Sequence, residues 1–281
     1  MAALSARLAA AVRKIHPVDW NNPTHALAKR EPRRGERAVL RAVVATPQGP
    51  LVVYNAHLEV FCGLLARIAQ LSDIWADARR MADRGLQHQA ILGDLNTMAH
   101  GIARLSRHYC CDPMRYRSIG LDEAMVWYRH VLPVTDPRYT AGSSDASSAS
   151  VGPGAAAEAV AAAAAGADAA GAAAGTGSGG ETAMLEAAGV AGIPINRQLL
   201  AWGLGEAVAR DAVNPGFADP FDPCTTVTLD NPQYRWFGLS LMKGKLDWVL
   251  LRRLRVAAQA VGNHGYELSD HKWLSADVAL D

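Results

Sequence analysis

The chain has 281 residues, of which 50% are hydrophobic and 20% charged, so it is long enough to bury a large core and too polar for an integral membrane protein. Its 28 lysine and arginine residues nearly balance its 27 aspartate and glutamate residues, which excludes a global positive field that would hold a nucleic-acid backbone by charge alone. No apolar run approaches the roughly 20 residues that cross a bilayer.

The cysteines and the first residues bear on where the protein works. Cys62, Cys110, Cys111 and Cys224 include no Cys-x-x-Cys pair, so the sequence supports neither a zinc knuckle nor a disulfide framework. We expect a reduced, intracellular chain, cytoplasmic by default and monomeric. Residues 1–15 carry Arg and Lys but no acid, which is typical of an ordinary amphipathic N-terminal helix and also of an organelle transit peptide.

We interpret residues 1–30 as an N-terminal helix or extension and residues 31–281 as one domain. A low-complexity insertion rich in Ala, Gly and Ser interrupts this domain at about 141–192. It lacks the large side chains that offset an ordering entropy of roughly 1–2 kcal/mol per residue, so we expect a disordered surface segment. Long insertions cost little loop-closure entropy, and the segments on either side look like parts of one α/β unit.

The pattern of apolar residues predicts strands mixed with helices. A turn-forming cluster between two β-rich runs suggests a hairpin, and apolar residues spaced by three or four indicate a helix that ends at Gly85. Strands joined by at least one hairpin and mixed with helices favour an α/β layered fold over a purely parallel one. We expect strands at 38–45, 51–57, 89–92, 246–251, 255–261 and 271–278, and helices at 64–81 and 194–209.

The first polar cluster stands at the end of the strand 51–57. Strand alternation places Asn55, His57 and Glu59 on one face, where a run of polar residues is unusual. Taken alone, a core histidine that a backbone carbonyl satisfies explains this segment nearly as well.

The second cluster follows the apolar strand 89–92. Period-two alternation puts Asp94 and Asn96 on the same side, so that a carboxylate suited to Mg²⁺ and a carboxamide suited to water or a phosphate oxygen converge. An Asp/Asn turn at a strand end is the alternative reading.

The third and fourth clusters lie near the C-terminus. Asp247 interrupts the otherwise apolar strand 246–251, and a carboxylate there is costly to bury unless it is paired. His271, at the start of the last predicted strand, is the obvious partner, because such a carboxylate fixes the imidazole tautomer and raises its basicity. An edge position of the strand is the competing explanation for Asp247.

In this order, the four clusters resemble the endonuclease/exonuclease/phosphatase superfamily, which has the deoxyribonuclease I fold. The resemblance implies a four-layer α/β (α+β) sandwich and a phosphoester hydrolase that uses Mg²⁺ or Mn²⁺ and in-line attack by water. Each motif is weak alone, but four in order are strong. The matching segments are Asn-x-His-Leu at 55–58, Gly-Asp-x-Asn at 93–96, the Asp-hydrophobic strand at 246–250 and Ser-Asp-His at 269–271.

The resemblance also implies a role for each matching residue. Three residues would contact the scissile phosphate, namely Asn55, His57 and Asn96. Asp94 would position or deprotonate the attacking water and bind the metal ion together with Asp270. His271, oriented by Asp247, would act as a general base or as a transition-state donor. The substrate class stays open among nucleic acid, nucleotides, lipid headgroups and inositol phosphates.

One departure from the family pattern matters. Family members begin with a strand that carries an Asn, followed by a motif whose Glu is the principal metal ligand. Only 54 residues precede Asn55, and Glu31 and Glu36 are their only glutamates, so we expect an N-terminally incomplete domain in which Glu59 is a candidate replacement ligand. The alternative function is therefore a catalytically degenerate or truncated member that acts as a binding or scaffold domain.

Overall fold

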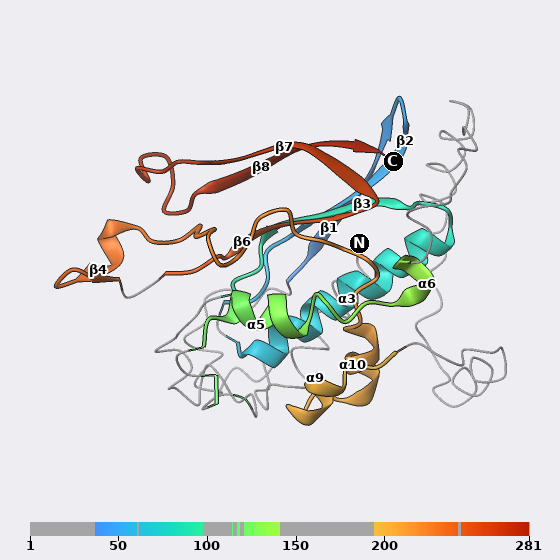
Figure 1. Cartoon of the computed structure of the whole chain (residues 1–281), viewed down its shortest axis with the longest axis horizontal. Helices are drawn as coiled ribbons and strands as arrows, with labels where there is room; N and C mark the ends of the chain where they lie inside the picture. Colours follow the sequence, from blue (N-terminus) through green and yellow to red (C-terminus); the bar gives the residue numbers. More distant parts are fainter. Residues whose placement is uncertain are drawn as a thin grey trace, which may run out of the picture.

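The computed structural model describes residues 37–60, 62–97, 114, 117–118, 121–140, 194–240 and 243–280. The expected N-terminal extension at 1–30, with its targeting candidate at 1–15, and the expected insertion at 141–192 lie outside these residues. The described part is a mixed α/β structure with one mixed four-stranded sheet and two two-stranded sheets (Figure 1). The predicted α/β (α+β) class is confirmed.

The central sheet has the strand order β1-β2-β3-β6. Its strands are β1 (Val39–Thr46), β2 (Gly49–Ala56), β3 (His88–Asp94) and β6 (Asp247–Arg252). The expected hairpin joins β1 and β2, while β3 runs parallel to β2 and antiparallel to β6. The carboxyl ends of β2 and β3 and the beginning of β6 therefore meet at the same edge of the sheet.

The helix α3 (Leu64–Asp83) carries the chain from β2 to the parallel strand β3 and covers one face of the sheet (Figure 1). Ile68, Leu71 and Trp75 follow the spacing that the sequence predicted and are fully buried in the main core. Gly85, at φ 85°, takes the left-handed conformation that commonly follows a helix end.

Three shorter helices, α5 (Glu123–His130), α9 (Arg197–Ala201) and α10 (Glu206–Asp211), lie on the same side of the sheet as α3 (Figure 1), and the four-residue α6 (Pro137–Thr140) follows α5. The expectation of one continuous helix over 194–209 is wrong. Gly203 has a φ of 97° between α9 and α10, and a helix cannot continue through that left-handed conformation.

The opposite face of the sheet carries an antiparallel ribbon of β7 (Leu254–Gly262) and β8 (Trp273–Leu280) (Figure 1). A second, smaller core lies between the ribbon and the sheet. It consists of buried residues from the sheet and its surroundings, Ala90, Phe221, Val249 and Leu251, and of partly buried residues of the ribbon. The described elements thus form three layers: helices, central sheet and ribbon.

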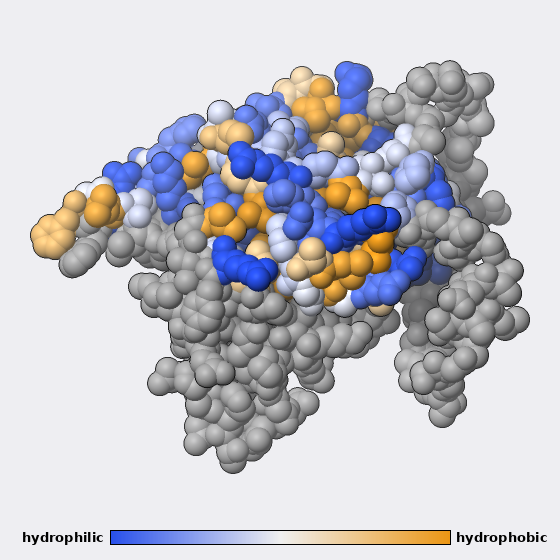
Figure 2. Space-filling view, turned by 60° about the horizontal axis from the view of Figure 1, so that its bottom comes forward, coloured by the Kyte–Doolittle hydropathy of each residue, from blue (hydrophilic) through white to orange (hydrophobic). Residues whose placement is uncertain are grey.

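A small hairpin projects from these layers (Figure 1). It consists of β4 (Arg235–Trp236) and β5 (Leu239–Ser240) and follows the 3-10 turn η1 (Pro232–Tyr234). The projecting tip is apolar (Figure 2), and Phe237 and Leu239 are 88% and 69% exposed. Among the described helices, none combines the length and the apolar character that a membrane-spanning segment needs.

The strand ends differ from the expected ones at positions that matter for the site. β2 ends at Ala56 rather than at residue 57, and β8 begins at Trp273 rather than at residue 271. His57 and His271 therefore stand on loops just beyond strand ends, where their side chains do not have to follow the alternation of a pleated strand.

A buried carboxylate ties α3 to the sheet. Asp77 accepts hydrogen bonds from Tyr54 Oη (3.0 Å) and Arg80 Nη2 (2.7 Å), and both of its oxygens accept from Arg41 Nη1. Burial alone would raise the pKa of Asp77, but the positive charges of Arg41 and Arg80 outweigh it and hold this pKa below its usual value of 3.8. The native state therefore favours the ionised carboxylate.

We expect Asp77→Asn to lower the free energy of unfolding at pH 7 by about 1–3 kcal/mol, because a neutral amide cannot pair with two guanidinium groups. Since the native pKa is depressed, the contribution of the carboxylate is present above the unfolded pKa and is lost as the pH falls through the native one. Urea unfolding at a series of pH values from 7 to 3 should show that the difference in unfolding free energy between wild type and Asp77→Asn becomes smaller as the pH falls. An advantage that stays constant over this range would contradict the assignment.

Candidate functional site

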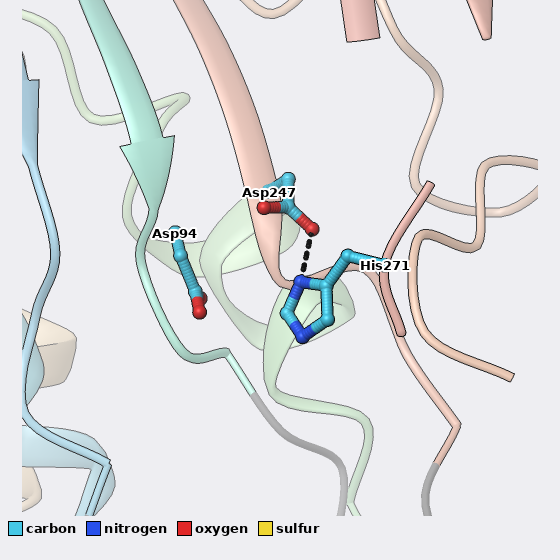
Figure 3. Close-up of side chains that lie close together, drawn as sticks. All are labelled: Asp94, Asp247 and His271. Carbon is cyan, nitrogen blue, oxygen red and sulfur yellow. Dashed lines mark hydrogen bonds and ion pairs between the residues drawn. The ribbon is translucent and has the colours of Figure 1, made fainter. Parts of the chain in front are cut away.

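Two carboxylates face each other at the edge where β2, β3 and β6 meet. Asp94 is the last residue of β3 and Asp247 is the first residue of β6, and the two are direct partners in the antiparallel ladder. Figure 3 shows both side chains at this strand end, with His271 approaching Asp247 from the other side. The topology of the sheet thus unites residues that are far apart in the sequence.

Each of these carboxylates has its own histidine. His271 Nδ1 lies 2.9 Å from Asp247 Oδ2 (Figure 3), which confirms the predicted pairing. His57 Nε2 lies 3.6 Å from Asp94 Oδ2. The His57 side chain is 53% exposed, whereas those of Asp94, Asp247 and His271 are 22–23% exposed. The cluster is therefore half-buried and opens to solvent on the His57 side.

The proton affinities of the cluster follow from this geometry. The pKa of Asp94 is raised, mainly because burial disfavours its charged form and further because Asp247 lies beside it. The pKa of His271 is also raised, and its hydrogen bond to Asp247 is the largest cause. A carboxyl group with a raised pKa is suited to acid–base chemistry near neutral pH. The same holds for an imidazole that a carboxylate holds in place.

The donor set also fits a divalent cation. One ligand atom each from Asp94, Asp247 and His271 lies within 4.8 Å of the others, close to the separation of about 4.2 Å between opposite ligands of an octahedral Mg²⁺. Two carboxylates suit Mg²⁺ or Mn²⁺, and the imidazole nitrogen shifts the preference toward Mn²⁺ and other transition metals.

Backbone hydrogen bonds hold the site loops together. Leu58 N, next to His57, donates to Asp94 O at 3.0 Å, and Leu95 N donates to Leu246 O at 2.8 Å. The loop after β2, the loop after β3 and the segment before β6 are thus linked in series. This linkage positions His57 beside Asp94 without any direct strand pairing at these residues.

The side chain of Asn96 does not join the cluster as expected, although its backbone N–H donates to Asp94 Oδ1 at 2.8 Å. Because β3 ends at Asp94 and Asn96 adopts a left-handed φ of 54°, strand alternation no longer applies to its side chain. Asn96 Nδ2 instead donates to Leu58 O at 2.8 Å, and the residue is buried. The prediction that Asp94 and Asn96 share a strand face is therefore wrong, and Asn96 fastens the loop that carries His57.

The other expected site residues are Asn55, Asp270 and Glu59. Asn55 is exposed near the end of β2, and Asp270 is exposed next to His271. Glu59, the candidate replacement for the family glutamate, forms an ion pair with Arg37 at 3.0 Å between its Oε2 and the arginine Nε. None of these three residues belongs to the three-donor group that the described residues form.

Several residues that support the site were not predicted from the sequence. Thr97 Oγ1 accepts a hydrogen bond from Trp248 Nε1 at 2.8 Å and donates to Lys245 O. Lys245 is fully buried, pairs with Asp219, and has its Nζ 4.3 Å from the centre of the Trp248 ring. Lys245 directly precedes a buried strand, so its charge stands where apolar residues are expected. The same signal identified Asp247 in the sequence.

Comparisons of the chain with protein-family models, with curated proteins and with solved structures found no match.

Gly93 allows the close approach of β3 to the end of β2. Its φ is 131°, and a Cβ atom at this position would lie 2.0 Å from Ala56 O. Real Cβ atoms do not come so near to a carbonyl oxygen, so any larger residue forces the two strand ends apart. The glycine before Asp94 is thus a steric requirement of the site.

We expect Gly93→Ala to destabilise the protein by about 1–3 kcal/mol, as overpacking of a core does, and to separate His57 from Asp94. Gly205→Ala is the matched control, because a Cβ atom at Gly205 would meet nothing within 4 Å. Thermal unfolding of the two variants measures the difference. Equal melting temperatures would contradict the steric argument.

The donor set yields a prediction for metal binding. We expect calorimetric titration to give a dissociation constant for Mn²⁺ about tenfold or more below that for Mg²⁺, because one of the three ligands is an imidazole nitrogen. Asp94→Asn should weaken both metals, whereas Asp277→Asn, a change at an exposed residue of β8, should weaken neither. Unchanged Mn²⁺ affinity in the Asp94→Asn protein would place the ion elsewhere.

Proposed function

We propose that this chain is a divalent-metal-dependent phosphoester hydrolase of the endonuclease/exonuclease/phosphatase type. One observation carries the proposal: Asp94 and Asp247 are partners across β3 and β6, and each has a histidine within 3.6 Å. Two acid–base pairs at a solvent-open strand edge supply the groups that water attack on phosphorus needs.

The Asp247–His271 pair has a clear chemical role in this proposal. A hydrogen bond from His271 Nδ1–H to Asp247 fixes the imidazole tautomer and leaves Nε2 for the reacting groups. From there His271 either accepts a proton as a general base or donates to a phosphate oxygen in the transition state. The raised pKa of His271 suits both of these roles.

Asp94 and His57 act on the other side of the proposed reaction centre. The raised pKa of Asp94 makes its carboxylate a better proton acceptor for water than an exposed aspartate. His57, the most exposed member of the cluster, binds a phosphate oxygen of the incoming substrate. Asp94, with Asp247 and His271 or with Asp270, would hold a Mg²⁺ or Mn²⁺ ion, which would supply positive charge to offset the charge that develops on the phosphate.

The rest of the proposal concerns the rim and the fold. Asn55 and Asn96 contact the substrate phosphate, and Asn96 does so through the second hydrogen of its amide Nδ2, because the first is bonded to Leu58 O. The substrate is a phosphomonoester or phosphodiester, free or within a nucleic acid, a nucleotide, a lipid headgroup or an inositol phosphate. The three described layers belong, in this proposal, to a four-layer sandwich of the deoxyribonuclease I type.

The second candidate function is a binding or scaffold domain without turnover. The observation that favours it is the ion pair of Glu59 with Arg37, because a carboxylate neutralised by a guanidinium is a poorer metal ligand than a free one. The two functions differ in a measurable way: the scaffold domain binds metal and phosphoester but does not hydrolyse it.

We expect the wild-type protein to hydrolyse bis(p-nitrophenyl) phosphate in Mg²⁺ or Mn²⁺ and to lose this activity in EDTA. His271→Ala and Asp94→Ala should each lower turnover by about 10²–10⁴-fold, the usual contribution of a positioned acid or base. The release of p-nitrophenol gives the rate directly.

The matched control is His264→Ala, which removes an exposed histidine in the turn between β7 and β8. It should retain wild-type turnover. Full activity of the Asp94→Ala protein would contradict the proposed hydrolase mechanism. Tight metal binding without turnover of any phosphoester in a panel would favour the scaffold domain.

A further inference from the structure

Thr228 lies fully buried beneath the Asp247–His271 pair and takes part in four hydrogen bonds. Its Oγ1 accepts from the backbone N–H groups of Leu246 at 2.9 Å and of Asp247 at 3.1 Å. Its own N–H donates to Gly244 O at 3.0 Å, and its carbonyl oxygen accepts from Lys272 N at 2.8 Å. One residue thus bonds to the segment that begins β6 and to the neighbour of His271.

This bridge spans a gap that the sheets leave open. Asp247 belongs to the central sheet, whereas β8, which follows His271, pairs only with β7 in a separate ribbon. No strand ladder among the described elements therefore sets the distance between Asp247 and His271. The hydroxyl of Thr228 fixes the backbone of Asp247, and its carbonyl fixes the backbone next to His271.

We propose that Thr228 is a positioning residue that sets the Asp247–His271 hydrogen bond by holding both backbone segments at once. The expected effect of Thr228 on turnover rests on the proposed function. Its expected effect on the orientation of His271 rests on the geometry alone. Thr228 touches no reacting group itself. It acts through Asp247 and His271.

The hydroxyl is the part of this bridge that a substitution can remove. In Thr228→Val a methyl group replaces Oγ1 with little change of shape, so the N–H groups of Leu246 and Asp247 lose a shared buried acceptor. The start of β6 must then shift to find other partners. Thr228→Ser keeps the oxygen and loses only a methyl group, so it should restore the wild-type geometry.

The first test reads the histidine directly by NMR of the ¹⁵N-labelled full chain. We expect a slowly exchanging Nδ1–H proton of His271, assigned by its loss in His271→Gln, in the wild type and in Thr228→Ser. It should be absent or strongly shifted in Thr228→Val. Thr225→Val, which changes an exposed threonine of the same segment, should leave the signal unchanged. An unaltered His271 signal in folded Thr228→Val protein overturns the proposal.

The second test measures hydrolysis of bis(p-nitrophenyl) phosphate by the same variants. A misplacement of about 1 Å can cost about 100-fold in rate, so Thr228→Val should lower kcat by up to that factor with KM within twofold, and Thr228→Ser should recover the rate. A rise in KM with unchanged kcat contradicts the positioning role. If the valine variant does not fold, Thr228→Ala removes the hydroxyl without placing a methyl group beside the two amides.

The two readouts separate the two proposals. Absence of turnover in the wild type, together with loss of the His271 signal in Thr228→Val, rejects the hydrolase and supports the positioning of His271. If the wild type turns over substrate and Thr228→Val has the same rate, the positioning role is rejected and the proposed hydrolase activity stands.

Discussion

Asp94 and Asp247 stand opposite each other in the β3–β6 ladder, and the rest of the site depends on this juxtaposition. Like charges at directly paired strand positions repel each other and are costly when half-buried. The structure offsets that cost with one imidazole for each carboxylate, His57 on the β2 side and His271 on the ribbon side. In the proposed function, the same repulsion would favour the binding of a divalent cation beside the two carboxylates.

Buried polar groups below the cluster hold this arrangement in place. Thr228 and Thr97 each bond to two polar groups at or just before the start of β6. The Lys245–Asp219 ion pair lies against the Trp248 ring. Networks of this kind specify one geometry, because every alternative leaves a buried group without its partner. The carboxylates at the edge are therefore supported by buried interactions with neighbouring segments of the chain.

Much of the fold and the centre of the site could be predicted from the sequence. Apolar periodicity located α3 and every long strand to within two or three residues, and the rule that a buried carboxylate needs a partner joined Asp247 to His271 correctly. The extrapolation of strand alternation past Asp94 failed for Asn96, because its left-handed backbone conformation is set by the turn and not by the strand. The helix expected over 194–209 failed at Gly203 for the same reason. The role of Thr228 depends on contacts between distant segments, which no local pattern reveals.

The place of β6 in the sheet has a consequence for folding during synthesis. β1, β2, α3 and β3 are consecutive in the chain and pack on one another, so they can assemble as soon as they leave the ribosome. β6 is made much later, and until it arrives β3 presents an unpaired edge of backbone donors and acceptors. Until then this edge of β3 is open to pairing with another polypeptide, and the docking of β6 both brings Asp247 beside Asp94 and covers the edge.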